Sequence, residues 1–216
     1  MSQQIPVSIV TGLPGSGKAE LLRRIVSETH GRRIALIRST ADQRAGKADQ
    51  RQGDLPQIAI LDNGCLECGT SDNLPRLLAQ LRVRHDDGAL GFDRVVIEAD
   101  DLNPEPLAAH LFADVDLGEH YMLDTIIAVL DAQQTLPRLQ ADVDTERQLG
   151  TADRILLTNT IPDVRQEDCV LRRWLERMTP HAAVQEITLA NVAIDEIFSA
   201  GIVAAPAIAA EQVQIF

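Results

Sequence analysis

Short apolar runs, rich in Val, Ile, Leu and Ala, recur along the chain between polar or glycine-containing stretches. Runs of this length and composition are typical of strands that are buried on both faces of a sheet. The first run stops at Gly12, and the later runs are spaced widely enough to leave room for helices. The expected strands are Ile5–Thr11, Arg33–Arg38, Gln57–Leu61, Arg94–Ala99, Ile126–Asp131, Arg154–Thr158 and Ala183–Ile187.

Between these runs, apolar residues recur at helical spacing. In Lys18–Thr29 they are Leu21, Leu22, Ile25 and Val26, a pattern that predicts a helix with one apolar face. The alternation of buried strands with helices predicts an α/β fold, with a mostly parallel sheet between two helical layers. The other expected helices are Leu74–Arg84, Gln133–Gln140, Glu146–Ala152 and Cys169–Met178.

The chain has 216 residues, enough to bury one large core, and we expect a single domain over residues 1–216. The polar stretch Ser39–Leu55 has neither strand nor helix spacing and is predicted to be a long loop. No internal repeat or low-complexity segment interrupts this arrangement.

Composition excludes several classes of function. A net charge of −12 argues against nucleic-acid binding, because phosphate backbones are held by clustered Lys and Arg. No apolar run is long enough to span a membrane, and the polar start MSQQ does not resemble a secretory signal. The chain has 3 cysteines, an odd number that does not indicate a disulfide framework. We therefore expect reduced thiols and a cytoplasmic location.

The strongest chemical signal is the stretch Gly12–Lys18, which reads GLPGSGK. It matches the fixed positions of the P-loop pattern and lies between a predicted strand and a predicted helix. Glycines let successive backbone N–H groups converge on phosphate oxygens at the start of a helix, and Lys18 is expected to reach the β- and γ-phosphates. The candidate phosphate-binding residues are Gly12, Gly15, Ser16, Gly17, Lys18 and Ala19.

Ala19 departs from the P-loop pattern, which has Ser or Thr directly after the lysine. That hydroxyl normally coordinates Mg²⁺, which bridges the phosphates and offsets their charge in the transition state. Alanine has no oxygen to offer, whereas backbone amides and Lys18 remain available for phosphate. Nucleotide binding therefore follows more directly from the sequence than hydrolysis does.

Later segments resemble the CobW-type metal-chaperone GTPases, relatives of the nickel-insertion GTPases. The resemblance rests on NGCLEC (Asn63–Cys68), VIEADDLNPEP (Val96–Pro106), DTIIAVLDA (Asp124–Ala132), ADRILLTNT (Ala152–Thr160) and the region Thr179–Phe198. These segments occur in the family's order over nearly the whole chain. The resemblance implies a P-loop NTPase fold, GTP as ligand, and metal delivery to a client metalloprotein. The family's separate C-terminal domain is not expected within these residues.

The NGCLEC segment implies a metal site in this family. Where the family has Cys-x-Cys-Cys, the chain has Cys65, Glu67 and Cys68 at the corresponding positions. Two thiolates and a carboxylate can supply three of the four ligands of Zn²⁺. The alternative is a pair of free thiols in a loop.

The family reads guanine with Asn-Lys-x-Asp after a strand, and here the strand is followed by Asn159 in the sequence TNTIPD. The base-reading aspartate is replaced by Ile161 or Pro162, depending on the register. Loss of that contact would cost about 2–4 kcal/mol of discrimination between bases. Asn159 remains a candidate nucleotide contact.

The resemblance also implies a role for Glu98 in holding Mg²⁺, directly or through water; the alternative is an ordinary carboxylate at a strand end. Asp101 stands where the family has a glycine whose amide senses the γ-phosphate. Asp100 and Asp101 either recruit a cation or mark an inactive switch.

These observations leave competing functional hypotheses. The chain is either a GTPase whose cycle drives metal delivery, with Lys18 and Glu98 as catalytic residues, or a pseudo-GTPase that binds nucleotide and acts through a protein partner. We favour nucleotide binding with slow or absent hydrolysis. A small-molecule kinase is a third reading, supported only by the phosphate loop. Pairing of two copies across the nucleotide face is expected by analogy alone.

Overall fold

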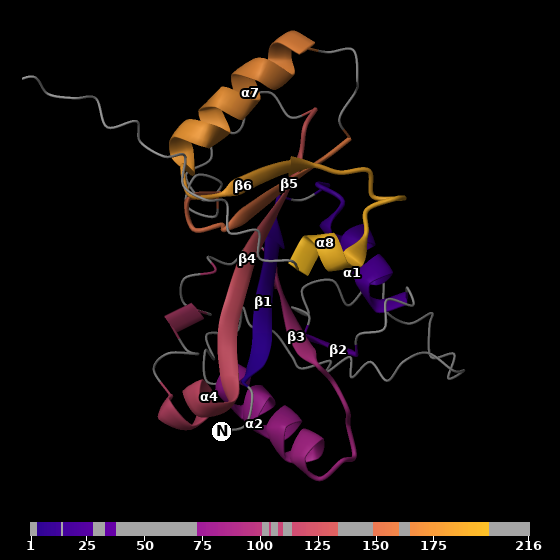
Figure 1. Cartoon of the computed structure of the whole chain (residues 1–216), viewed down its shortest axis with the longest axis vertical. Coiled ribbons are helices and arrows are strands. Elements are labelled where there is room, and N and C mark those ends of the chain that lie inside the picture. The colour runs from indigo at the N-terminus through magenta and orange to yellow at the C-terminus, as the bar shows by residue number, and fades with distance from the viewer. Residues whose placement is uncertain are drawn as a thin grey trace, which may run out of the picture.

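The computed structural model describes residues 4–13, 15–27, 33–37, 73–100, 104, 108–109, 114–133, 149–159 and 165–198. Within them lies a six-stranded sheet of order β2-β3-β1-β4-β5-β6, in which every neighbouring pair is parallel (Figure 1). The predicted α/β class with a parallel sheet is thereby confirmed. The strands are β1 (Ile5–Gly12), β2 (Ile34–Ile37), β3 (Arg94–Asp100), β4 (Tyr121–Asp131), β5 (Arg154–Thr158) and β6 (Ala183–Glu186).

β1 is the centre of the sheet, between β3 and β4. Its residues from Val7 to Gly12 are all buried, so both of its faces need apolar or small side chains. Gly12 lies opposite Asp100 of β3, and Asp131 of β4 lies opposite Thr158 of β5. The carboxyl ends of the central strands therefore meet at one edge of the sheet, where parallel α/β proteins bind their ligands.

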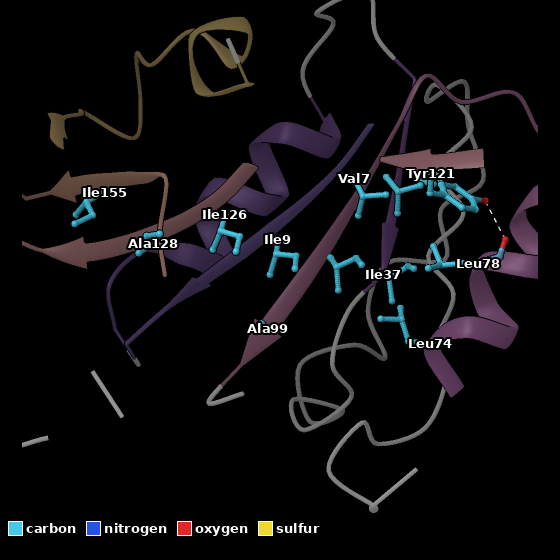
Figure 2. Packing of buried hydrophobic residues seen from close by; sticks show 14 of the residues in the cluster. Val7, Ile9, Ile37, Leu74, Leu78, Ala99, Tyr121, Ile126, Ala128 and Ile155 are labelled. Carbon is cyan, nitrogen blue, oxygen red and sulfur yellow. Dashed lines mark hydrogen bonds between the residues drawn. The ribbon is translucent and has the colours of Figure 1, made fainter. Parts of the chain in front are cut away.

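One face of the sheet is covered by α2 (Asn73–Asp86), α4 (Val115–His120) and α7 (Arg165–Met178). Side chains of these helices and of the sheet form a single buried apolar cluster. Figure 2 shows part of it, including the Tyr121 hydroxyl donating to the carbonyl of Leu78 over 2.9 Å. Burial raises the pKa of Tyr121 above its ordinary value, since the charged phenolate is disfavoured away from water.

The other face is covered by α1 (Lys18–Ser27) and α8 (Ile194–Phe198). Leu21, Leu22 and Ile25 of α1 are at most 1% exposed, as their helical spacing predicts. They share a second apolar cluster with Ile197 and Phe198 of α8. The arrangement is thus three-layered, with the sheet between two helical layers.

β4 begins at Tyr121, earlier than the expected Ile126, because a charged residue in the strand hides its apolar pattern. Asp124 accepts a 2.5 Å hydrogen bond from Arg94, the first residue of β3. Arg94 also donates to the hydroxyl of Ser8 over 2.6 Å and stacks on Phe198 at 4.7 Å. A half-buried carboxylate with such a partner is tolerated within a strand.

Helix α4 was not expected from the sequence. It is a short helix, VDLGEH, whose first turn is capped by the carboxylate of Asp114 accepting from the Leu117 amide over 3.1 Å. Its single buried residue, Leu117, is too little for apolar periodicity to show in the sequence. Elsewhere α7 begins at Arg165, before the expected Cys169.

Some predictions lie wholly or mostly outside the described residues: the strand at 57–61, the loop at 39–55 and the helix at 133–140. Of the expected helix at 146–152, Leu149 and Gly150 are helical. In the part of the chain that the structure describes, no helix combines the length and the apolar character needed to cross a bilayer. The extent of a single domain over residues 1–216 stays a prediction.

Candidate functional site

The loop between β1 and α1 is held close to the sheet at Gly12. A β-carbon on Gly12 would lie 2.3 Å from the backbone oxygen of Val129 in β4, a distance that no side chain can adopt. Its φ of 153° is also in a region that favours glycine. The first glycine of the pattern is therefore required for the loop to turn directly over the neighbouring strand.

The next residues of the loop are fixed by Thr158, the last residue of β5. The Thr158 hydroxyl donates a 2.7 Å hydrogen bond to the carbonyl of Ser16, and Thr158 is fully buried. The Ser16 amide donates to the carbonyl of Leu13 over 3.1 Å, closing a tight turn. The loop is thus tied to a strand end that is distant in the sequence.

The open side of the loop is at Gly15. A β-carbon on Gly15 would have nothing within 4 Å, whereas one on Gly17 would meet Leu189 at 2.6 Å and Thr158 at 3.7 Å. The described part of the loop is therefore packed at Gly12, Ser16 and Gly17 and open at Gly15. The amide of Leu21 donates to the carbonyl of Gly17 over 2.9 Å, so α1 starts directly from this clamped residue.

The ammonium group of Lys18 lies at the carboxyl end of β3. It donates to the carbonyl of Ala99 over 3.4 Å, and Lys18 is only 6% exposed. Glu98, one residue earlier in β3, is 1% exposed and lies opposite Val10 of β1. The fold therefore brings Lys18 and Glu98, two predicted site residues far apart in the sequence, to neighbouring positions at one edge of the sheet.

Ala19 is exposed at the first turn of α1 and offers only a methyl group. The hydroxyl of the nearby Ser16 is buried and has no hydrogen-bond partner within the described residues, and it lies 3.1 Å from a β-carbon built on Gly12. It lies beside the backbone of Gly12. The residues present thus do not fit the usual P-loop set of magnesium ligands.

Asn159 follows β5 and has a φ of 54°, the left-handed conformation that Asn tolerates better than most residues. Its amide nitrogen donates to the carboxylate of Asp131 over 3.2 Å. The other oxygen of Asp131 accepts from the Gln133 amide over 2.8 Å, and the Ala132 amide donates to the Thr158 carbonyl over 2.9 Å. This polar rim lies at the same edge of the sheet as the phosphate loop.

The predicted metal ligands Cys65, Glu67 and Cys68 lie outside the described residues, as do Asp101 and the replacements at Ile161 and Pro162. Across the ranges that are described, no group of three or more His, Cys, Asp or Glu side chains lies close enough to hold a metal ion. The metal site therefore stays a prediction from the sequence.

The sequence did not predict that three residues contact this site: Thr158, Leu189 and Asp131. Thr158 ends an expected strand, and the topological rule that carboxyl ends of parallel strands meet could have pointed to it. Asp131 ends the strand before it, so the same rule applies. Leu189 carries no such signal, because a leucine after a strand is ordinary.

A parallel sheet with a glycine-rich loop running from its central strand into a helix, and a lysine at that helix's start, defines a P-loop nucleotide-binding domain. Residues 6–186 match the family described as "CobW/HypB/UreG, nucleotide-binding domain". The chain belongs to this family, as its resemblance predicted.

Relatives and solved structures agree with this assignment. The chain is 36% identical over 197 residues to the zinc chaperone YjiA of Escherichia coli (strain K12), covering 90% of this chain and 61% of that protein. It is 28% identical to the zinc-regulated GTPase metalloprotein activator 1 of Schizosaccharomyces pombe, covering 85% of this chain and 46% of that protein. The crystal structure of Zn(II)-bound YjiA GTPase from E. coli is similar with a TM-score of 0.70 at 29% identity, covering 91% of this chain and 62% of that one. The chain thus spans less than two thirds of these relatives.

Proposed function

We propose that this chain binds a nucleoside triphosphate, GTP in the first place, and that it serves metal delivery with weak or absent hydrolysis. The observation that supports binding is the clamped loop: Gly12 is packed against β4, Ser16 is tied to Thr158, and Gly15 is open. Such a loop presents backbone amides to an anion without further rearrangement. The names of the relatives, a zinc chaperone and a zinc-regulated GTPase, support guanine and zinc.

Lys18 supplies the positive charge of the proposed site. Its hydrogen bond to the Ala99 carbonyl is long, at 3.4 Å, and a phosphate oxygen would be a stronger, charge-assisted acceptor for the same ammonium group. Because Lys18 is almost fully buried, its charge acts where water screens it little. We propose that it neutralises the β- and γ-phosphates.

Slow hydrolysis follows from the residue that succeeds Lys18. Without a hydroxyl at Ala19, the first turn of α1 supplies no oxygen to Mg²⁺, which normally offsets the charge of the transferred phosphoryl group. We propose that Glu98 helps to hold a cation there, directly or through water. Removal of one transition-state contact commonly lowers the rate a hundredfold or more. Binding and turnover are therefore separable in this chain.

The alternative function is a pseudo-GTPase that binds nucleotide and regulates a partner protein without turnover. Ala19 favours it, because the substitution removes a metal ligand while leaving the phosphate loop intact. Ala19→Thr separates the two functions: a rise in Mg²⁺-dependent phosphate release indicates that this position limits the rate. No rise indicates that another departure, such as Asp101, dominates.

Calorimetric titration with GTP, GDP and ATP, with and without Mg²⁺, tests the binding proposal. Lys18→Met should weaken triphosphate binding by about 30-fold or more, because a charge-assisted contact to phosphate is lost. Arg23→Met is the matched control, since Arg23 lies on the same helix with 75% of its side chain exposed. Equal affinity of the parent and Lys18→Met would contradict the proposal.

For metal delivery, we propose that Cys65, Glu67 and Cys68 hold Zn²⁺ or a similar divalent ion for a client metalloprotein in the cytoplasm. Two thiolates and a carboxylate suit zinc. Cys65→Ser and Cys68→Ser should each lower zinc affinity sharply in a competition titration with a chelating dye. An affinity equal to that of the parent would remove the metal role. A homodimer across the nucleotide face stays a prediction.

A further inference from the structure

We propose that Leu189 is a positioning residue for the phosphate loop: it holds Gly17 in its left-handed conformation and acts on phosphate binding through the backbone, not through the nucleobase. This inference rests on the proposed binding of an anion at the loop. It assigns a role to the connection between β6 and α8, which is far from the loop in the sequence.

The contact that carries the inference is between Leu189 and Gly17. A β-carbon on Gly17 would lie 2.6 Å from Cδ1 of Leu189 and 3.8 Å from its Cγ, so the leucine packs directly on the glycine backbone. Gly17 has a φ of 88°, which glycine adopts as readily as a negative φ, so the side chains packed on it decide which conformation the loop keeps. The Thr158 methyl group lies 3.7 Å from the same point.

Leu189 can act as a clamp because its own connection is fixed at both ends. The Ile187 amide donates to the Leu157 carbonyl over 2.8 Å, which continues the β5–β6 pairing. The amides of Asn191 and Val192 both donate to the Thr188 carbonyl, over 2.9 and 3.0 Å, and close a turn around Leu189. At the far end, Arg24 of α1 donates to the Val192 carbonyl over 3.3 Å. The turn is thus tied to the helix that the loop initiates.

The position of Gly17 matters for phosphate because it directly precedes Lys18 and accepts the first hydrogen bond of α1, from the Leu21 amide. A rotation of Gly17 would turn the amides of residues 17 and 18 away from a common point. Amides at the start of the helix form the anion site of a P-loop, so their alignment sets its affinity. Leu189 is therefore expected to affect every ligand that carries the phosphate chain.

The test compares GTP with inorganic tripolyphosphate, which has the phosphates but no base, in Leu189→Ala, Leu189→Met and the parent. Leu189→Ala should lower the affinity for both ligands by a similar factor, about tenfold. Leu189→Met should bind both ligands about as tightly as the parent, because it keeps the side-chain volume. Val192→Ala is the control: it is buried in the same connection, but the atoms nearest Gly17 belong to Leu189 and Thr158. Weakening of GTP alone would show that Leu189 contacts the base and would overturn the inference, as would unchanged affinity for both ligands.

A second measurement needs no ligand. Hydrogen exchange of the Leu21 amide measures how often its hydrogen bond to the Gly17 carbonyl opens. Exchange of the Ile187 amide measures the opening of its hydrogen bond to the Leu157 carbonyl, which anchors the turn. Leu189→Ala should speed exchange at Leu21 at least fivefold relative to Ile187. Equal acceleration at both amides, or none at Leu21, would overturn the inference. If the parent binds neither GTP nor tripolyphosphate, the proposed function fails, while exchange at Leu21 still decides whether Leu189 holds the loop.

Discussion

The phosphate loop and the polar rim lie at the same edge of the sheet but are held in opposite ways. The loop is fixed by buried contacts: the Gly12 backbone against Val129, and the Ser16 carbonyl on the hydroxyl of Thr158. The rim depends on an exposed hydrogen bond between Asn159 and Asp131. Buried contacts couple to the stability of the core, whereas an exposed bond contributes little. We therefore expect the loop to stay intact when residues of the rim are substituted.

Among the variants that test this comparison, Gly12→Ala should cause the largest loss of stability. Its β-carbon would lie 2.3 Å from a backbone oxygen in the central sheet, so either β4 or the loop must move. We expect a loss of roughly 3 kcal/mol or more in the free energy of unfolding, measured by urea denaturation.

Gly15→Ala is the matched control. Its φ of 82° also strains a side chain, but the space around it is open. We expect a cost of about 1–2 kcal/mol, from backbone strain alone. If the two variants lose the same stability, close packing of the loop against β4 is not what fixes it.

Thr158→Val should have an intermediate effect. It keeps the shape of the side chain, but removes the hydroxyl that donates to Ser16 and leaves that carbonyl buried without this partner. The expected cost is about 1–3 kcal/mol of stability. A weaker affinity for phosphate should accompany it, measurable with tripolyphosphate. Unchanged stability would mean that the loop does not depend on β5.

Asn159→Ala should have a smaller effect, about 1 kcal/mol or less, since the bond to Asp131 is exposed and only the left-handed φ adds to the cost. The ratio of GTP to ATP affinity in this variant tests Asn159 as the candidate nucleotide contact. A large fall in GTP affinity alone would show that Asn159 is a base contact, and would bring the rim into the binding site.

The smallest expected effect is at a surface ion pair that serves as a reference. Partial burial by itself would raise the pKa of Asp93, but hydrogen bonds and charge from Arg33 hold it below its ordinary value. A carboxyl whose pKa is lowered on folding adds stability above its unfolded pKa, near 4, and loses it as the pH falls through the folded value. Asp93→Asn should therefore reduce the free energy of unfolding by under about 1 kcal/mol at pH 7, and not at pH 2. A difference that persists at pH 2 would point to packing.

Much of this fold follows from the sequence because its central strands are apolar on both faces and its first helix has regular spacing. Leu21, Leu22 and Ile25 were expected on one face and are buried there. The apolar pattern fails to predict a strand where a tertiary contact compensates a polar residue. Asp124 interrupts the pattern at the start of β4, and its ion pair with Arg94 is not visible in the sequence. Helix α4 was not predicted, because its one buried leucine produces no helical periodicity in the sequence.

The candidate site divides in the same way. The fixed spacing of GLPGSGK predicts the residues of the loop. The pairing of β1 with β3 then brings Lys18 to the carbonyl of Ala99, the residue next to Glu98. Contacts of common residue types cannot be predicted from the sequence, because the role of such a residue depends on which side chain or backbone group it contacts in the fold. Thr158 and Leu189 are ordinary in the sequence and become informative only against Ser16 and Gly17.

The attachment of α8 has a practical consequence. Arg154 donates to the carbonyls of Glu196 and Ile197, the latter over 2.9 Å, and Arg94 stacks on Phe198. Two arginines from different strands thus hold the last described turn against the sheet. A fluorophore attached near Phe198 would report the tilt of that turn relative to strands β3 and β5 rather than its own tumbling.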